Sequence, residues 1–375
     1  MKTVVVSAVN FYEGGPLTVL RECLEELSAY SDGWRIVALV HDKHLISMPL
    51  VELIEFPKSR KTWLHRLFYE WLAFHKLSKT LKPDIWLSLH DITPRVMAKR
   101  QYVYCHNPAP FYKVSAREAW QSPAFALFNF FYGFLYSINI KNNRAVIVQQ
   151  DWLRKAFERR YQLENVIVAY PVGEENFPIL KESADSTTHY NCDIFFFPSY
   201  PRVFKNFEEI CKAASILATN PAWNGEIILT IDGSENRYSS WVLDQYSKVR
   251  GLKFIGLQSK HEMDMLYERC DCLLFPSRLE TWGLPISEAK ALGKPMIVAD
   301  LPYAHETVGN YDKVKFVSTE RPDQLADIIL QAHLNSWPQE KIVSDEPVQP
   351  FAKNWRELIA LLLENDTSHS NGSKS

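Results

Sequence analysis

The chain has 375 residues, of which 46% are hydrophobic, and a formal net charge of -2 at pH 7. A chain of this length exceeds one ordinary hydrophobic core, which predicts two domains. Its nearly balanced charge gives no global attraction to nucleic acid, so we expect no nucleic-acid partner.

The N-terminus and the cysteines bear on the compartment. Residues 1–10, MKTVVVSAVN, lack the apolar region and small-residue cleavage site of a secretory signal, and they predict a first strand. The longest apolar stretch, Phe125–Ile140, is too short to span about 30 Å of hydrocarbon as a helix. Cys270 and Cys272 lack the paired CxxC spacing of a zinc site. We therefore expect reduced, buried thiols, no transmembrane segment and a cytoplasmic protein.

Short apolar runs alternate with helix-like segments through most of the chain. The expected strands of the first half are Thr3–Val9, Arg35–Val40, Asp84–His90, Tyr102–Cys105 and Ala145–Gln149. Those of the second half are Asp193–Pro198, Glu226–Ile231, Lys253–Ile255, Cys272–Phe275, Pro295–Ala299 and Val314–Val317. Runs that are apolar on both faces and separated by helices are typical of parallel strands covered on both sides. The fold class is therefore α/β, with two Rossmann-like, doubly wound halves.

Composition divides the chain further. The polar, aperiodic stretch Lys181–Tyr190 predicts a linker, so that residues 1–180 form the first domain and 191–348 the second. Helical apolar spacing in residues 349–364 predicts a last amphipathic helix. The low-complexity tail 365–375 is expected to be disordered.

The loop after the first expected strand, NFYEGGP at 10–16, contains Gly14 and Gly15 just before a helix that begins at Leu17. Glycines there let backbone N–H groups approach an anion at the positive end of a helix. The loop is not GxGxxG, and no acidic residue ends a strand about twenty residues later, so a dehydrogenase is poorly supported. The alternative is a purely structural turn.

A more specific stretch is Phe275–Pro295, FPSRLETWGLPISEAKALGKP, which predicts a buried strand, a loop and a helix. Glu280 lies in the loop at the carboxyl end of the strand, where open α/β sheets bind ligands. Gly283 and Leu284 offer backbone N–H groups at the helix start. Glu288, about one turn into the helix, could accept hydrogen bonds from the hydroxyls of a ribose. The alternative is that Glu280 caps the helix and Glu288 is a surface residue.

The pattern Glu280-x7-Glu288 encloses GLP at 283–285 and is followed by GKP at 293–295. It resembles the signature of glycosyltransferase family 4, which comprises retaining enzymes of the GT-B fold. The resemblance covers nearly the whole chain, including the Gly-Gly loop, the basic pair in YPRVFKN and the final helix. It implies two Rossmann-like domains that face across a cleft, with the last helix returning to the first domain.

The resemblance also implies residue roles on the donor side. Glu280 would hold the hydroxyls of the donor sugar, and Glu288 would bind the ribose. Gly283 and Leu284 would give backbone N–H groups to the donor. The family usually has Phe where this chain has Trp282, which puts the shape of the donor pocket in doubt.

Further roles follow from the same resemblance. Arg202 and Lys205 match the basic pair that neutralises the diphosphate, whose negative charge grows as the glycosidic bond breaks. His106, after the strand YVYC, matches an active-site histidine that orients the sugar and the acceptor. His90 and Asp91 also point toward the cleft, with no role decided between catalysis and structure. Asp-x-Asp is absent from the chain, so we expect no metal cofactor.

Residues 58–82 are basic and aromatic, with Glu70 as the one acid. The cations are Lys58, Arg60, Lys61, Arg66, Lys76, Lys79 and Lys82, and the apolar residues at roughly helical spacing are Trp63, Leu67, Trp71, Phe74 and Leu77. A basic amphipathic helix of this kind can lie in an anionic membrane interface. The alternative is a helix packed on the sheet with a solvated basic face. The aromatic segment 111–136 also has two interpretations: it is part of the hydrophobic core, or it is a surface that binds the acceptor.

Together these observations predict a retaining glycosyltransferase that moves a hexose-type sugar from a GDP-, UDP- or dTDP-sugar to a glycan acceptor. The acceptor would be lipid-linked, as in bacterial O-antigen or capsule synthesis, and the enzyme would lie at the inner face of the plasma membrane. Two alternatives stay open: a non-catalytic scaffold of the same fold, and a sugar-nucleotide epimerase.

Overall fold

The computed structural model describes residues 1–171, 192–337 and 346–364, and these fall into two compact units. The expected linker 181–190 and the expected tail 365–375 lie outside the described residues. The first unit comprises the described parts of Met1–Phe111, Phe130–Glu174 and Pro347–Ser375, and the second those of Tyr112–Asn129 and Glu175–Glu346.

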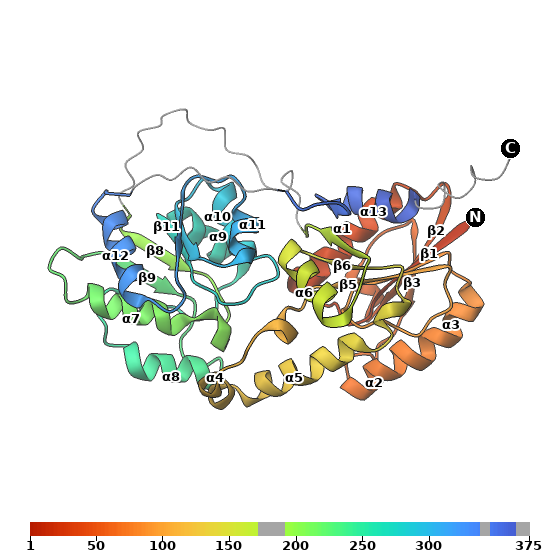
Figure 1. Cartoon of the computed structure of the whole chain (residues 1–375), viewed down its shortest axis with the longest axis horizontal. Coiled ribbons are helices and arrows are strands. Elements are labelled where there is room, and N and C mark those ends of the chain that lie inside the picture. Colours follow the sequence, from red (N-terminus) through yellow and green to blue (C-terminus); the bar gives the residue numbers. More distant parts are fainter. Residues whose placement is uncertain (172–191, 338–345, 365–375) are drawn as a thin grey trace. The chain divides into compact units, whose positions relative to one another are not determined.

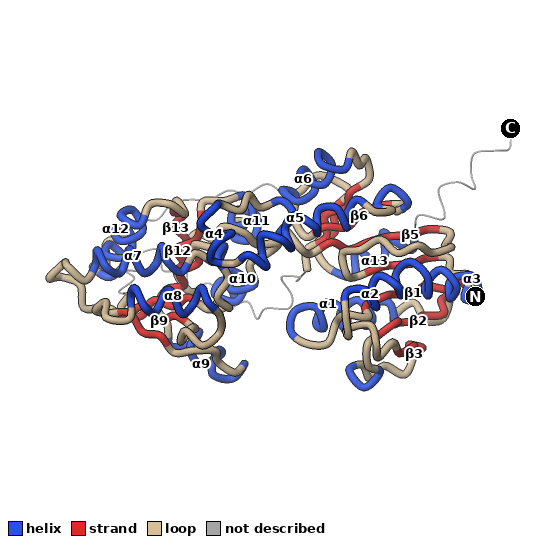
Figure 2. The backbone as a smooth tube through the Cα atoms, turned by 90° about the horizontal axis from the view of Figure 1, so that it is seen from below, coloured by secondary structure: helices blue, strands red, loops and turns tan. Residues whose placement is uncertain are grey.

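The first unit is built on an eight-stranded sheet in the order β14-β7-β6-β5-β4-β1-β2-β3. Its strands are β1 (Lys2–Ala8), β2 (Trp34–Val40), β3 (Val51–Glu55), β4 (Ile85–Ser88), β5 (Arg100–Cys105), β6 (Ala145–Val148), β7 (Val166–Ala169) and β14 (Phe351–Ala352). All neighbouring pairs are parallel, and β1, β2 and β3 run side by side in Figure 2. Three strands, β3, β7 and β14, were not among those expected.

Helices cover both faces of this sheet. They are α1 (Gly14–Ser28), α2 (Trp63–Phe68), α3 (Phe74–Leu81), α6 (Asp151–Tyr161), α13 (Trp355–Glu364) and the C-terminal part of α5 (Pro123–Ser137), with a π-helical segment η2 (Tyr69–Ala73) between α2 and α3. Along β1, Val4 and Val6 enter a core with α1 and α13, whereas Val5 enters a second core with Phe74 of α3. Figure 1 shows α1 and α13 on one side of the sheet and α3 on the other. Burial on both faces explains why the central strands are mostly apolar.

The C-terminal helix α13 belongs to the first unit, as the sequence predicted. It follows β14, which pairs with β7, and it packs against α1 in the core. Trp355 is buried, and its ring lies 5.3 Å from that of Tyr104 in β5. The chain therefore leaves this unit and returns to complete its sheet and its core.

The second unit has a six-stranded parallel sheet in the order β10-β9-β8-β11-β12-β13. Its strands are β8 (Ile194–Phe197), β9 (Glu226–Leu229), β10 (Leu252–Phe254), β11 (Cys272–Phe275), β12 (Met296–Ala299) and β13 (Val314–Val317). Its helices are α4 (Ala116–Gln121), α7 (Phe207–Leu217), α8 (Arg237–Tyr246), α9 (Lys260–Arg269), α10 (Leu284–Ala291), α11 (Pro302–Val308) and α12 (Pro322–His333). In β8, Phe197 packs on Phe207 of α7 and Phe196 on Tyr267 of α9, so both faces are again covered.

The two-unit division differs from the expected domains in one segment. Residues Tyr112–Asn129, which the sequence places inside the first domain, cluster with the second unit, and the boundary falls within α5. The physical reason is a set of specific contacts: Phe125 packs on Phe204, and Arg278 pairs with Glu118.

One apolar stretch, at the sequence boundary between the first and second units, passes a simple test for membrane spanning. Pro123–Asn142, which includes α5, has 20 residues and is long and apolar enough to cross a membrane by length and composition alone. In its apolar window, 22% of the residues are buried. The continuous α-helix α5 ends at Ser137 and has 15 residues, so the expectation that this stretch is too short to span stays a prediction.

The six cysteines are free and buried, as predicted. Burial raises the pKa of the Cys270 thiol to about 11, which keeps it protonated at neutral pH.

Trp355→Ala tests the contribution of α13 to the first unit. We expect a loss of about 3–5 kcal/mol in the free energy of unfolding of this unit, because a large buried side chain is removed. Urea unfolding followed by circular dichroism should show a lower midpoint for this unit. Arg356→Ala is the matched control on the same helix: its side chain is 77% exposed, and its removal should change stability by less than about 0.5 kcal/mol. Equal midpoints for the two variants would contradict the packing role of Trp355.

Candidate functional site

The donor-side candidates lie where the strand order of the second unit changes direction, between β8 and β11. Open α/β sheets bind ligands outside the carboxyl ends of the strands at such a point. Lys205 ends a short 3-10 turn (Val203–Lys205) after β8, and Glu280 lies in the loop after β11. The Nζ atom of Lys205 is 2.5 Å from Oε1 of Glu280. Two loops far apart in sequence thus deliver one ion pair.

This ion pair is sheltered but not sealed. The side chains of Lys205 and Glu280 are 17% and 13% exposed, so both charges are held close to the surface of the unit. Arg202, the second basic residue of the predicted pair, is exposed on the same loop, with its guanidinium 5.9 Å from the centre of the Tyr200 ring. The structure therefore brings Lys205 to Glu280 and leaves Arg202 on the surface nearby.

Gly283 is the N-cap of α10 and adopts a left-handed backbone with φ +84°. A Cβ atom there would lie 3.3 Å from side-chain atoms of both Ile286 and Phe275, so glycine is required by conformation and by space. In the first turn of α10, Pro285 has no N–H group, and the N–H of Ile286 donates to the carbonyl of Gly283 at 2.9 Å. The N–H of Leu284 is therefore the one of this turn that is left at the positive end of the helix dipole. Anion binding at this turn stays a prediction, supported by a glycine N-cap at a helix start.

The two carboxylates of the motif have separate environments. Gly283, not Glu280, caps α10, and no side chain caps this helix. Glu288 lies half-buried on α10, where its Oε2 accepts a hydrogen bond from the hydroxyl of Tyr267 in α9. Burial raises the pKa of Glu288, while the Tyr267 hydrogen bond opposes that rise. Neither alternative for these acids, a helix cap or an open surface residue, describes the structure.

Trp282 points into the unit, which limits its effect on a ligand. It is buried, and its Nε1 donates a hydrogen bond to Oγ of Ser287 at 2.9 Å. This contact holds the loop before α10 against the helix, so the indole supports the Gly283 turn.

The first unit has its own switch point, between β1 and β4. A cavity of about 190 Å³ lies there. Its lining residues are Asn10, Phe11, Tyr12, Glu13, Pro16, Arg66, His90, Asp91 and His106. Gly14 and Gly15 open α1 between two of these residues, and a Cβ atom on either glycine would meet nothing within 4 Å. The glycine backbone therefore borders open space beside the cavity.

Asp91 organises this cavity. Its Oδ1 accepts hydrogen bonds from the backbone N–H groups of His106 at 2.8 Å and Asn107 at 3.2 Å. The hydroxyls of Tyr132 and Tyr136, one helical turn apart on α5, donate to the same carboxylate at 2.8 and 2.9 Å. Asp91 is buried and has φ +70°. It is therefore a structural anchor that fixes the backbone of His106 at the cavity wall.

A second carboxylate, Glu70, is buried behind the cavity. The π-helical segment η2 carries Glu70, whose Oε1 lies 3.1 Å from Nδ1 of His90. Neither carboxylate oxygen of Glu70 makes a hydrogen bond of good geometry among the described residues. Burial raises the pKa of Glu70 to about 8, opposed by the charge of Arg66, and burial lowers the pKa of His90. Single π-helical turns of this kind are frequent at functional sites.

Residues 193–345 match the family described as "Glycosyl transferases group 1". The matched residues all belong to the second unit, which is therefore the part of the chain that is similar to this family. The chain is also similar to the O-antigen chain mannosyltransferase RfbU of Salmonella typhimurium, at 24% identity over 247 residues. That match covers 64% of this chain and 63% of RfbU, so it spans less than two thirds of the relative.

Solved structures show the fold. The sucrose-phosphate synthase from Thermosynechococcus elongatus superposes with a TM-score of 0.61 at 15% identity, covering 90% of this chain and 92% of that one. Anabaena HepE in complex with UDP-glucose gives 0.54 at 16% identity, covering 96% and 95%. These likenesses confirm the predicted GT-B class of two Rossmann-like units. Because such folds host several activities, the acceptor has to be argued from the sites.

A larger cavity of about 520 Å³ lies elsewhere in the first unit. Its lining residues are Ser137, Asn139, Ile140, Lys141, Asn142, Arg160, Tyr161 and Gln162. None of the predicted site residues is among them, whereas His106, His90 and Arg66 converge on the smaller cavity. We therefore place the first-unit site at the smaller one. In the part of the chain that the structure describes, no group of three or more His, Cys, Asp or Glu side chains could hold a metal ion.

Sequence reasoning missed several partners of the predicted residues. Tyr267 holds Glu288, although 21 positions separate them, and no local pattern signals that contact. The i, i+4 spacing of Tyr132 and Tyr136 on an apolar helix was an available signal for a shared polar target. Arg278 lies two residues before Glu280, so its charge next to the family motif was a local signal that the sequence offered.

Glu70→Gln tests the buried carboxylate beside His90 and Arg66. The folded-state pKa of about 8 lies above the ordinary value of 4.5, so the folded chain keeps a proton that the unfolded chain releases between these values. Wild-type stability should therefore fall with rising pH, by up to about 1.4 kcal/mol per pH unit in that window. Glu70→Gln removes this dependence, so its stability relative to wild type should rise from pH 5 to pH 8 in urea unfolding.

The matched control for that measurement is Glu52→Gln, which removes an exposed carboxylate paired with Arg35. Its stability relative to wild type should stay nearly constant over the same range. A constant difference for Glu70→Gln as well would contradict a raised pKa at Glu70.

Proposed function

We propose that the chain is a retaining, metal-independent glycosyltransferase that moves a hexose from a nucleoside diphosphate donor to a glycan hydroxyl. The observation that carries this proposal is the Lys205–Glu280 pair at the switch point of the unit that is similar to group 1 glycosyl transferases, next to the left-handed Gly283 turn. The similarity to RfbU, an O-antigen mannosyltransferase, supports polysaccharide synthesis as the setting. The likeness to HepE, solved with UDP-glucose, supports a nucleotide sugar as donor.

The chemistry of transfer explains the charges of the second unit. Breaking the glycosidic bond leaves negative charge on the diphosphate, which Lys205 and Arg202 stabilise without having to reorganise. Glu280 accepts hydrogen bonds from hydroxyls of the donor sugar once the donor reaches Lys205. Glu288, oriented by Tyr267, accepts from the ribose hydroxyls. Each acid thus holds one sugar of the donor, and neither is needed as a base.

The first-unit cavity serves the acceptor side of the proposed reaction. His106, fixed by Asp91, orients the acceptor hydroxyl and the reacting sugar. The acceptor is proposed to be a lipid-linked glycan, because an exposed apolar face with cations at its ends lies on the same unit.

That apolar face is formed by side chains that are each 52–78% exposed. They are Leu64, Phe68 and Leu72 of α2 and η2, and Phe130, Phe131 and Phe134 of α5. Trp63 and Tyr132, whose ring centroids are 6.1 Å apart, join the two helices at this place. The exposed cations Lys61, Lys76 and Lys79 lie near the ends of the α2–α3 stretch. Apolar side chains flanked by lysines suit an anionic membrane surface.

The contacts of α5 favour a position on the membrane surface over a position across the membrane. Tyr132 and Tyr136, on the inner side of its C-terminal half, donate to the buried Asp91, so this half of the helix is tied to the first unit. Phe130 and Phe134 on its outer side are the exposed residues. We therefore propose a peripheral protein at the cytoplasmic face of the membrane.

Lys205→Ala and Glu280→Gln test the proposed transfer. Each should lower turnover by about 10²–10³-fold or more, because one stabilising group for the transition state is lost. The assay measures sugar transfer to a lipid-linked glycan fraction, using the UDP-, GDP- or dTDP-sugar that most raises the melting temperature of the wild type. Lys212→Ala, which removes a partly exposed lysine on α7, should keep wild-type turnover.

Turnover at the wild-type level in either site variant would refute the role of that residue. Conversion of the nucleotide sugar without any acceptor would instead favour an epimerase. A folded wild type that binds none of the nucleotide sugars would favour the scaffold.

Vesicle co-sedimentation tests the apolar face. The triple variant Phe130→Ser/Phe131→Ser/Phe134→Ser should pellet with anionic phosphatidylglycerol vesicles at least several-fold less than wild type, because the inserted aromatic area is lost. Lys61→Glu/Lys76→Glu/Lys79→Glu should lose binding to anionic vesicles specifically. As a control, Leu257→Ser/Met265→Ser removes exposed apolar side chains of the second unit and should pellet as wild type does. Equal pelleting of all four proteins would contradict membrane docking by this face.

A further inference from the structure

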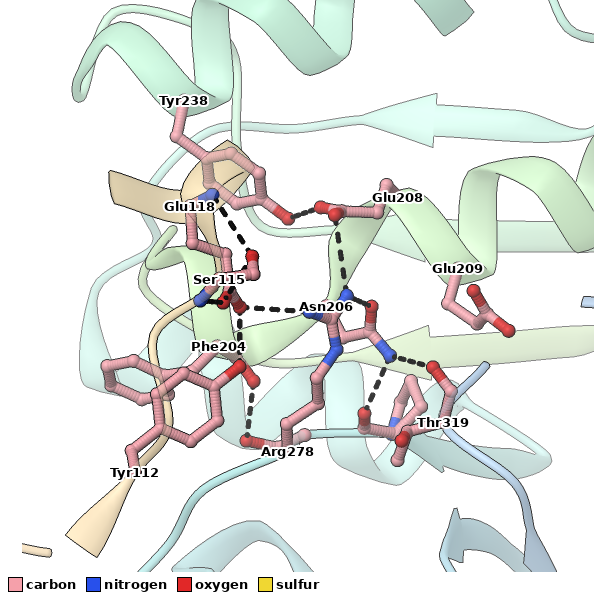
Figure 3. A network of polar contacts seen from close by, with 12 residues as sticks. Tyr112, Ser115, Glu118, Phe204, Asn206, Glu208, Glu209, Tyr238, Arg278 and Thr319 are labelled. Atoms are coloured by element: carbon pink, nitrogen blue, oxygen red, sulfur yellow. Dashed lines mark hydrogen bonds and ion pairs between the residues drawn. The ribbon is translucent and has the colours of Figure 1, made fainter. Parts of the chain in front are cut away.

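The segment Tyr112–Asn129, here called the strap, lies in the second unit although its neighbours on both sides in the sequence lie in the first. It contains α4 and the start of α5. In Figure 3, Tyr112 and Glu118 of the strap lie beside Phe204 and Arg278. Phe204 directly precedes Lys205, and Arg278 stands two positions before Glu280.

The first contact is aromatic and lies at the loop of Lys205. The ring of Phe204 lies 5.1 Å from that of Phe125 and 6.3 Å from that of Tyr112, both in the strap. Phe204 directly precedes Lys205 in the chain. Aromatic pairs at these separations add about 0.5–1.5 kcal/mol each beyond the area that they bury. The strap therefore holds the residue that sets the direction of the lysine.

The second contact is an ion pair at the loop of Glu280. Nη1 of Arg278 donates to Oε1 of Glu118 at 2.9 Å, and this glutamate is 4% exposed. Glu118 also accepts hydrogen bonds from the Tyr112 hydroxyl and from the backbone N–H and Oγ of Ser115, the latter two at 2.8 Å. Its carboxylate thus accepts hydrogen bonds from four donors. Removing one partner of a buried pair is costly, because the other charge is left uncompensated.

Arg278 connects the two loops. Its backbone N–H donates to the carbonyl of Phe204 at 2.8 Å, and its Nη2 reaches the side chains of Asn206 and Glu208. Asn206, which follows Lys205, in turn donates to the carbonyls of Pro276 and Thr319. The two residues that the strap contacts are thus Phe204, one position before Lys205, and Arg278, two positions before Glu280.

Other contacts fix the strap itself to α8. The guanidinium of Arg237 lies 4.2 Å from the centre of the Trp120 ring, and that of Arg117 lies 4.9 Å from the ring of Trp241. Cation–π pairs of this kind add stability at partly exposed positions. The strap is therefore anchored independently of the donor loops and can act on them as a fixed support.

We infer that the strap positions the Lys205–Glu280 pair for the donor, with Glu118 and Arg278 as positioning residues. This inference rests on the proposed function for its ligand, a nucleoside diphosphate. It makes donor affinity depend on a segment that the sequence inserts between strands of the first unit. Neither Glu118 nor Arg278 touches the donor in this account.

The test compares Glu118→Gln with Glu262→Gln. Both glutamates close a capping box at the third residue of a helix, with Ser115 and Ser259 respectively, but Glu262 is exposed and pairs with no arginine of the donor loops. Glu118→Gln should weaken binding of UDP, GDP or dTDP, whichever the wild type binds, at least 10-fold by calorimetry. Glu262→Gln should change it by less than about 3-fold, the size of effect expected from a cap alone.

Coupling between the two positioning residues gives a second readout. Arg278→Gln should weaken nucleotide binding to a similar extent, and the double variant Glu118→Gln/Arg278→Gln should be within about 2-fold of the weaker single variant. The inference would be overturned if the loss of nucleotide affinity in the double variant equalled the product of the two single-variant losses. Wild-type nucleotide affinity in folded Glu118→Gln protein would overturn it as well.

Hydrogen exchange without ligand separates this inference from the proposed function. In Glu118→Gln, amides of residues 277–281 should exchange at least several-fold faster than in wild type, and in Glu262→Gln they should not. That result would support the strap even if the wild type bound none of the nucleotides, and unchanged exchange would overturn it. If Glu118→Gln fails to fold, Tyr112→Phe removes one donor to Glu118 and should raise exchange in the same residues to a smaller extent.

Discussion

The constraint on which this molecule depends is the covering of parallel sheets on both faces. In both units the central strands are mostly apolar, because helices pack on either side of them. Polar chemistry then has room only at the strand ends, and the carboxyl ends diverge where the strand order reverses. The Gly14–Gly15 loop, His90–Asp91 and the Lys205–Glu280 pair all lie beyond strand ends at such points. One packing rule thus accounts for the location of both candidate sites.

The two candidate sites differ in the charges that they present. In the second unit, Lys205 offers a sheltered positive charge with one carboxylate beside it, which suits a ligand that brings phosphate charge and hydroxyl donors together. In the first unit, the carboxylate of Asp91 accepts hydrogen bonds from two backbone amides and two tyrosine hydroxyls. Its role is therefore structural. Asp91 thereby leaves His106 as the polar group presented to the cavity. The difference lies in how fully the hydrogen-bonding capacity of each acid is occupied.

Much of this could be predicted from the sequence, for physical reasons that also explain the failures. Central strands can be predicted because they are apolar runs. β3 is an edge strand that contains Glu52 and Glu55, and β14 has only two residues, so neither gives a clear sequence pattern. The GLP turn and its helix were local and were found. The capping box Ser115-x-x-Glu118 was also local, yet Arg278 lies 160 positions away, and nothing near Glu118 indicates it. Contacts of that range set which unit a segment joins, which is why residues 112–129 were assigned to the first domain.

The central claim is that a nucleotide sugar binds at the second-unit switch point. The most direct measurement is hydrogen–deuterium exchange of the whole chain with and without a saturating nucleoside diphosphate sugar. The account predicts slower exchange at residues 202–206 and 280–288, where the donor would contact the Lys205 loop and the start of α10. Slower exchange confined to the larger first-unit cavity, at residues 137–142 and 160–162, would contradict it.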